Sequence, residues 1–414
     1  MPCRCISRRG FGYALASLCF ATSTALAQES LVQTATSGND WEKSTSLQTW
    51  TYATHSSPFA DSVLNPRNSI LKIARAQYLS DTRLDFSLKN SDADLVLKPR
   101  LIGEVREGGS GTSSTAEGYL SQAFGRFRIR PDLTATLGRE LLTWGPANFR
   151  SPSNPYYYDS GKTRPLEDVP GVDIARIDWS AGRWTSTVGF VSGGRQNDEE
   201  WRQSSLLKLA YRGNDFLVGG ILSKPRNRRS FVGGYAQFSI GDAWLLYGEL
   251  SSTTTSNITT TSSTLPAAAR ATVGTIGAAY TFEGGASLGA EYLHDGRGYS
   301  RAAQAAYFSA IEASLASSQI AVDLRRGGQS RLLGRDYLNI LLQSNLQDPS
   351  TYWRVSPTVN LQDRSRQLLL YGEHSLHPRI ALFGSLLWSS GGRSTEFGAV
   401  VRSTATLGLK IFLM

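Results

Sequence analysis

Apolar and polar residues alternate with a period of two through most of the chain, in segments of about 9–13 residues that end at turn residues. Between Arg83 and Lys89, for example, Leu84, Phe86 and Leu88 alternate with charged and polar residues. Because successive side chains of a strand point to opposite faces, each segment predicts a strand with one apolar and one polar face. Eighteen such segments begin near Ser69, Arg83, Asp94, Glu117, Asp132, Val172, Arg183, Gln203, Asp215, Arg229, Ala243, Ala271, Ala286, Gly334, Ser350, Arg366, Arg379 and Thr395.

The connections between these segments alternate in length. Those after odd-numbered segments include the long polar stretches 144–171, 193–202, 251–270 and 295–333, whereas those after even-numbered segments are mostly tight. Bacterial outer-membrane barrels have short periplasmic turns, longer outer loops and an even number of strands. The sequence therefore predicts an all-β fold, a transmembrane antiparallel β-barrel of about 18 strands (16 possible) over residues 69–414. Its expected location is the outer membrane of a Gram-negative bacterium, among outer-membrane lipid and lipopolysaccharide.

The first 27 residues have the anatomy of a cleavable signal peptide. Three arginines precede an apolar stretch, which is followed by Ala25-Leu26-Ala27, a cleavage site of small residues. All three cysteines of the chain lie in this leader, so the mature protein is expected to form no disulfide and no thiolate metal site. Beyond the leader, no apolar run approaches the roughly 20 residues of a membrane helix.

The end of the chain carries a motif of its own. The last strand resembles the outer-membrane β-signal, with polar Thr406, Gly408 and the apolar residues Ile411 and Leu413 at the expected spacing. The usual terminal aromatic residue is missing, and Met414 ends the chain instead. The resemblance implies that the barrel-assembly machinery is a partner.

Two stretches lack the barrel pattern. Residues 28–68 are polar and weakly patterned, which predicts an N-terminal periplasmic arm or a segment inside the lumen. Within the longest loop, Phe308, Ile311 and Leu315 have helical spacing, and Ser300 is a suitable N-cap. A loop helix over residues 300–318 is expected, either over or inside the pore mouth or covering the apolar rim.

The polar face of each strand must line a watery interior, because charges in hydrocarbon cost several kcal/mol. The pore-lining basic residues predicted in this way are Arg83, Lys89, Lys98, Arg100, Arg126, Arg128, Arg176, Lys208, Arg354 and Arg402. A basic wall inside a low-dielectric tube attracts anions, so a preference for small anionic solutes or acidic oligosaccharides is expected. The alternative is that many of these charges neutralise one another or lie at the rims.

The most distinctive segment is the loop that contains Trp144, Pro146, Tyr156, Tyr157 and Tyr158. Prolines fix its backbone and its aromatic rings offer flat amphipathic faces, so it is expected to constrict the pore or to stack sugar rings. It could instead simply close the outer end of the barrel.

Over about twenty residues, the Trp-Gly-Pro and Asn-Pro parts of this loop resemble those of capsule-assembly outer-membrane surface proteins. They are also similar to Gram-negative outer-membrane porin-like β-barrels, and the barrel pattern spans most of the mature chain.

The chemistry available to the mature chain favours transport over catalysis. Its only imidazole bases are His55, His294, His374 and His377, and no phosphate-binding loop, dinucleotide motif or Cys/His metal spacing occurs. We therefore expect no enzyme activity, no cofactor, no metal and no nucleic-acid partner. The predicted function is a channel for small hydrophilic, anionic solutes. The alternative is a barrel with a plugged lumen that binds or assembles surface polysaccharide.

Overall fold

The computed structural model describes residues 41–109, 111–159, 162–194, 203–226, 230–254, 270–313 and 332–414. Its strands are β1 (Glu42–Pro58), β2 (Ala76–Lys89), β3 (Ala93–Glu107), β4 (Ser113–Arg130), β5 (Leu133–Glu140), β6 (Val172–Ala181), β7 (Trp184–Gly194), β8 (Ser204–Arg212), β9 (Phe216–Pro225), β10 (Phe231–Ile240), β11 (Trp244–Thr254), β12 (Arg270–Thr281), β13 (Ser287–Asp295), β14 (Asp336–Gln343), β15 (Thr351–Asn360), β16 (Arg366–His377), β17 (Ile380–Ser390) and β18 (Val401–Phe412). Two short helices, η2 (Pro66–Asn68) and α2 (Arg301–Ala313), lie in connections.

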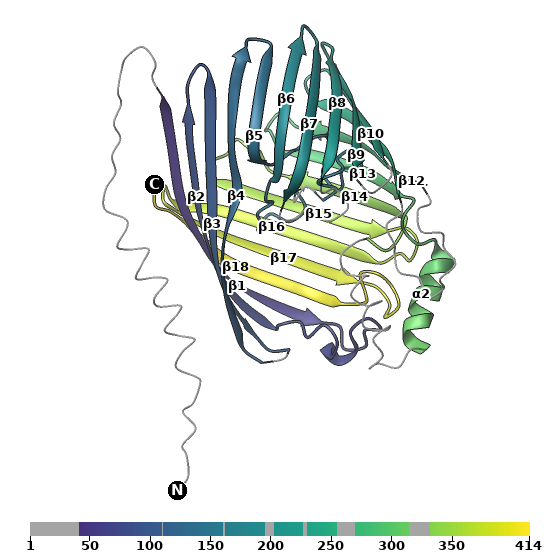
Figure 1. Cartoon of the computed structure of the whole chain (residues 1–414). Coiled ribbons are helices and arrows are strands. Elements are labelled where there is room, and N and C mark those ends of the chain that lie inside the picture. The colour runs from purple at the N-terminus through teal and green to yellow at the C-terminus, as the bar shows by residue number, and fades with distance from the viewer. Residues whose placement is uncertain are drawn as a thin grey trace.

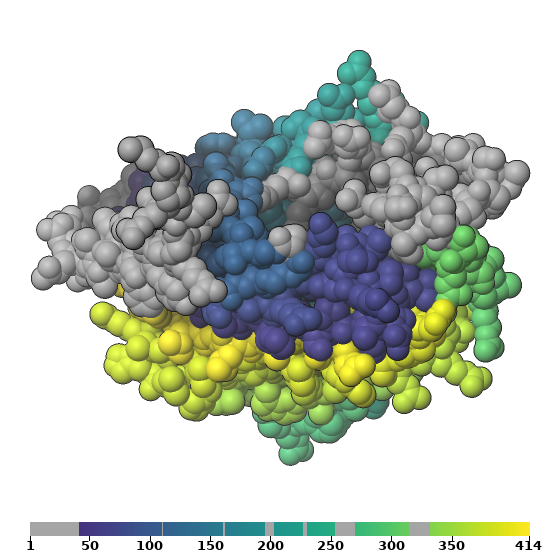
Figure 2. Space-filling view, turned by 90° about the horizontal axis from the view of Figure 1, so that it is seen from below, coloured from purple at the N-terminus to yellow at the C-terminus, as the bar shows by residue number. Residues whose placement is uncertain are grey.

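The eighteen strands form one closed antiparallel barrel (Figure 1). Each strand pairs with its neighbours along the chain, and β1 closes the sheet by pairing with both β2 and β18. In Figure 2 the purple N-terminal residues lie directly against the yellow C-terminal ones, where this closure occurs. The predicted fold class is confirmed, and closure leaves no unpaired strand edge inside a membrane.

The outer face of the barrel is apolar. Large hydrophobic side chains at alternate strand positions are highly exposed, among them Leu137 (66%), Val188 (58%) and Ile276 (65%). The residues between them point inward, where polar and charged side chains gather. This is the arrangement that lipid on the outside and water on the inside require. Among the described helices, none has the length and apolar character of a membrane span.

The prediction for residues 28–68 was wrong where the structure describes this stretch, because residues 42–58 are the first barrel strand. The alternation of β1 is hidden by its composition. Trp50 and Tyr52 point inward onto Phe383, whereas the outward positions include Thr49 and Thr51. The segments predicted near Ser69 and Arg83 are a single strand, β2, preceded by a loop with η2. The predicted count was correct because one missed strand offset one counted twice. The signal peptide lies outside the described residues.

The loops alternate in length as predicted. Turns after even-numbered strands run from two residues (378–379) to seven (344–350), whereas the loop after β5 covers 141–171 and that after β13 covers 296–335. The final strand starts at Val401 rather than near Thr395, because residues 391–400 form a loop.

The predicted loop helix is present as α2, and residues 314–318 of the prediction lie outside the described residues. The hydroxyl of Ser300 accepts a hydrogen bond from the Ala303 N–H at 3.3 Å, which confirms the N-cap. Phe308 and Ile311 are buried against Leu64 and Ala399, residues of two neighbouring outer loops. The helix therefore packs on the loops at the outer end of the barrel, where it is labelled α2 at the right of Figure 1.

Candidate functional site

The loop 141–171 folds into the barrel rather than away from it. Its residues contact inward-pointing side chains of strands on the far side, including Glu249 of β11 and Glu291 of β13. A second set of contacts reaches the near wall, where Arg83 of β2 donates to the Leu166 carbonyl at 3.2 Å. The loop thus crosses the interior between two walls of the barrel.

Two buried carboxylates hold the crossing segment. Glu249, which is 4% exposed, accepts hydrogen bonds from the Ala147 N–H at 2.8 Å and the Ser151 hydroxyl at 2.7 Å. It also accepts from the N–H and the hydroxyl of Ser153, at 3.1 and 2.8 Å. Charged hydrogen bonds in such surroundings are among the strongest in proteins, so this cluster fixes the loop firmly.

Glu291 provides the second anchor. It accepts from the backbone N–H groups of Asn148 and Phe149, at 2.6 and 2.7 Å, and from the Tyr247 hydroxyl at 2.6 Å. The close fit requires a glycine at position 145, where φ is +83° and an added Cβ would lie 2.3 Å from Glu249 Oε1. The inward path of the loop therefore depends both on the backbone conformation at Gly145 and on the two carboxylates of the barrel wall.

The predicted loop aromatics pack rather than stand free. The Tyr156 hydroxyl hydrogen-bonds to Ser204 and Ser223 at 3.1 Å each, and the Tyr157 hydroxyl donates to the Pro170 carbonyl at 2.8 Å. These two residues are only 6% and 3% exposed, so packing covers most of each ring, although both residues border the cavity beside the loop.

The remaining loop positions are partly buried. Trp144 packs against the cluster that holds Tyr156, and Lys208 of β8 lies 5.5 Å from its ring. Pro146 lies in the segment that Glu249 holds. Tyr158 donates to Asp295 of β13 at 2.7 Å.

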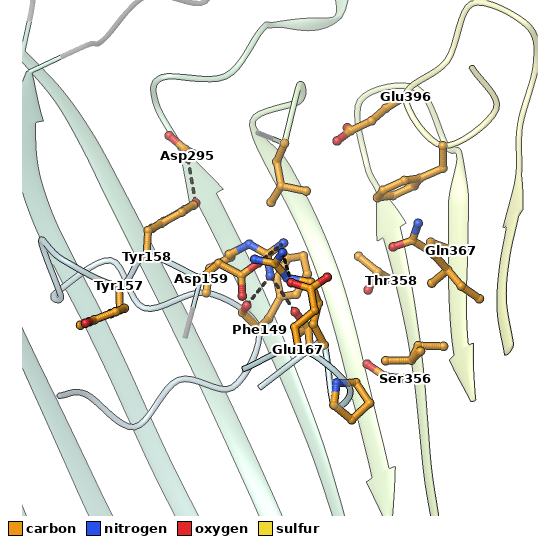
Figure 3. Close-up of a pocket in the computed structure, with 18 of the residues that line it drawn as sticks. Phe149, Tyr157, Tyr158, Asp159, Glu167, Asp295, Ser356, Thr358, Gln367 and Glu396 are labelled. Atoms are coloured by element: carbon orange, nitrogen blue, oxygen red, sulfur yellow. Dashed lines mark hydrogen bonds and ion pairs between the residues drawn. The ribbon is translucent and has the colours of Figure 1, made fainter. Parts of the chain in front are cut away.

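A cavity of about 890 Å³ remains beside the loop. One side is formed by loop residues that include Arg150, Tyr158 and Glu167, and the other by inward residues of β15–β18 (Figure 3). The close-up shows Ser356, Thr358 and Gln367 on the wall opposite Asp159 and Glu167. The described residues therefore leave a partly open space with a mixed polar and apolar lining beside the inward loop.

Most of the predicted pore-lining basic residues are paired with acids. The pairs are Arg83–Asp81 (2.6 Å), Lys98–Asp85 (3.3 Å), Arg100–Asp85 (2.8 Å), Arg126–Glu140 (2.7 Å), Arg128–Asp94 (3.1 Å) and Arg176–Glu140 (3.0 Å). Arg354 donates to the Lys162 carbonyl, Arg402 lies 5.3 Å from the Phe59 ring, and Lys89 is exposed at the end of β2.

None of the ten predicted basic residues lines the cavity beside the loop. The loop contributes different charges, which sequence patterns did not single out. Arg164 is paired with Asp159 at 3.1 Å and with Glu167 at 2.5 Å. These residues lie in a loop without periodicity, so only their charge could have pointed to them.

The predicted assembly motif forms the seam of the barrel. The hydroxyls of Thr406 and Thr54 lie 2.9 Å apart, and a Cβ on Gly408 would lie 2.4 Å from Tyr52 Cβ. Ile411 pairs with Thr49, and the Leu413 N–H donates to the Leu47 carbonyl at 2.8 Å. These contacts explain the residue types, whereas recognition by the assembly machinery stays a prediction.

One of the four histidines of the mature chain, His294, lies on the outer face of the barrel. His294 hydrogen-bonds to Asp336 at 2.8 Å, whereas its neighbour Asp295 points inward to Tyr158. The side chains of His294 and Asp295 therefore lie on opposite faces of β13. Among the described residues, no group of three metal-ligating side chains occurs.

Comparison with models of protein families finds no match, and comparison with curated protein sequences finds none. Solved structures are similar in fold. OccK11 (OpdR) of Pseudomonas aeruginosa has a TM-score of 0.53 and 11% identity, over 90% of this chain and 96% of that one. OccAB1 of Acinetobacter baumannii has a TM-score of 0.53 and 10% identity, over 90% and 97%.

These neighbours are Gram-negative outer-membrane porins. The chain therefore has the fold of a Gram-negative outer-membrane porin, and its apolar outer belt is the one that the outer membrane requires. The local resemblance to capsule-assembly surface proteins gains no support from these comparisons and stays a prediction.

Proposed function

We propose that this protein is a channel through which small hydrophilic solutes diffuse across the outer membrane. The observation that carries the proposal is the cavity of about 890 Å³ that remains beside the inward loop. The loop contacts β2, β11, β13 and, through Lys162 and Arg354, β15, yet this cavity separates it from most of the inward side chains of β15–β18, many of which carry hydroxyl groups. A wall of this kind suits solutes that keep most of their hydration.

The loop 141–171 would set the size limit of this channel. Seven hydrogen bonds to Glu249 and Glu291, six of them from the loop, resist its movement. We therefore propose a narrow passage rather than a wide, open pore.

The anion preference expected from the basic residues remains a prediction. Six of the ten residues that carried it are paired with carboxylates, which cancels much of their field at a distance. The alternative of a polysaccharide-binding barrel is weakened at Tyr156 and Tyr157, whose rings are buried.

Liposome swelling tests the proposal. Proteoliposomes that contain the purified barrel should swell in isotonic solutions of small sugars, with a rate that falls steeply as the sugar grows from one ring to three. Liposomes that contain heat-unfolded protein are the control. Swelling no faster than this control, from a barrel shown to be folded by its heat-dependent gel mobility, would refute the channel.

A further inference from the structure

The wall opposite the loop carries two uncharged rows of inward side chains. Cross-strand register places Thr358, Gln367 and Ser389 in one row and Ser356, Leu369, Leu387 and Thr404 in the other. All seven residues line the cavity. In the second row, Leu369 and Leu387 are directly paired between hydroxyl-bearing neighbours, so a small apolar patch sits inside a polar frame.

A buried amide orients two of these hydroxyls. Asn339 of β14, which is 3% exposed, donates to the Ser356 hydroxyl at 3.0 Å and to the Thr358 hydroxyl at 2.8 Å. A hydroxyl that accepts a hydrogen bond keeps its own proton for donation. Asn339 is also paired in register with Glu291, which anchors the loop. The cross-strand row that contains the loop anchor therefore also contains the amide that orients the hydroxyls of the opposite wall.

The charges of the loop 141–171 that face this wall are already paired with one another, and Glu396, which also lines the cavity, accepts hydrogen bonds from Tyr337 and Asn360. Arg150 lies 3.4 Å from Asp159, and Arg164 bridges Asp159 and Glu167. A charged solute would lose part of its hydration shell in the cavity, but the loop charges that could replace this hydration are already bound to one another. Its entry would therefore carry a net cost in free energy. An uncharged solute with many hydroxyls meets donors and acceptors without this cost.

We propose that the cavity is a binding subsite for a neutral saccharide, with the Leu369–Leu387 patch against the C–H face of a sugar ring. Gln367 and Thr404, both half-buried, would hydrogen-bond to the ring hydroxyls. A few placed polar groups around an apolar surface are the usual composition of small-molecule sites. This inference rests on the proposed channel function and names the solute class.

Three monosaccharides of matched size separate the outcomes. Glucose, glucuronate and glucosamine share a ring and differ in charge, so proteoliposome swelling compares them directly. We expect glucose to enter faster than either charged sugar. Faster entry of glucuronate would overturn the saccharide subsite and leave the channel standing, whereas failure of all three to enter, together with absence of conductance, would remove both.

Residue-level evidence comes from sucrose block of the single-channel current. With each protein's current referred to its own conductance in KCl without sucrose, Gln367→Leu should weaken the block about fivefold, the effect of losing one net hydrogen bond. Gln343→Leu is the matched control, because Gln343 of β14 also points inward but does not line the cavity. Thr404→Val keeps the side-chain shape and should act like Gln367→Leu. Equal block in all four proteins would overturn the proposal.

Discussion

Removal of the charge that anchors the inward loop should loosen the constriction. In Glu249→Gln the side chain keeps its size, but one of its two terminal oxygens becomes an NH₂ group. Oε1 faces the Ala147 N–H, and Oε2 faces the N–H and hydroxyl of Ser153 and the hydroxyl of Ser151. Whichever way the amide turns, a donor therefore opposes a donor.

The expected cost follows from the hydrogen bonds. Loss of one bond to a charged acceptor, with its donor left buried, costs about 3 kcal/mol, which raises the undocked population of the loop about 150-fold. The barrel itself should stay folded, because no strand pairing depends on this side chain. The loop, not the barrel, is the part that moves.

Single-channel recording in planar bilayers measures this effect. Wild-type protein should show one main conductance, and Glu249→Gln should add frequent excursions to a higher level. Glu104→Gln is the control, since this inward carboxylate contacts Arg106 at 2.6 Å and lies away from the loop. Traces from Glu249→Gln that match wild type in both level and noise would refute the anchoring argument.

Three further changes test other parts of the structure. Gly145→Ala, with its Cβ forced against Glu249, should reproduce the noisy, larger currents of Glu249→Gln; quiet currents would contradict the close fit. Replacing Arg126 and Arg128 by serine removes two positive charges and leaves Asp94 without an arginine partner, so the reversal potential in a salt gradient should move toward cations. Burial raises the pKa of Glu396, in the loop 391–400, to about 7. Because its ordinary pKa is 4.5, the docked loop gains stability as the pH falls from about 7 toward 4.5 and loses it as the pH rises. Proteolysis of this loop should therefore be slower at about pH 5 than at about pH 8, and Glu396→Gln should abolish the difference.

The fold was predictable because the features that specify each strand lie within the strand's own sequence and its flanking turns. Alternation of apolar and polar residues marks each strand that faces lipid on one side, and turn residues mark the ends. β1 escaped this pattern because threonines occupy outward positions and Trp50 points inward, where it lies 5.9 Å from Phe383. The Phe383 contact joins residues from the two ends of the chain, and no local pattern records it.

The site was predictable only in part. The loop around Trp144 was recognised from its prolines and aromatics, but the anchors that turn it inward lie 102 and 143 residues further along the chain, on β11 and β13. The basic residues could be proposed from the alternation along each strand, whereas their acidic partners depend on cross-strand register. The two uncharged rows on β15–β18 were overlooked because serine and threonine between apolar residues look the same on every strand.

The most direct test of the channel is the current through the purified protein in a planar bilayer under a salt gradient. The proposed channel predicts a steady, small conductance, because a cavity of about 890 Å³ remains beside the anchored loop. Persistent electrical silence from a barrel with the heat-dependent mobility of a folded one would contradict it.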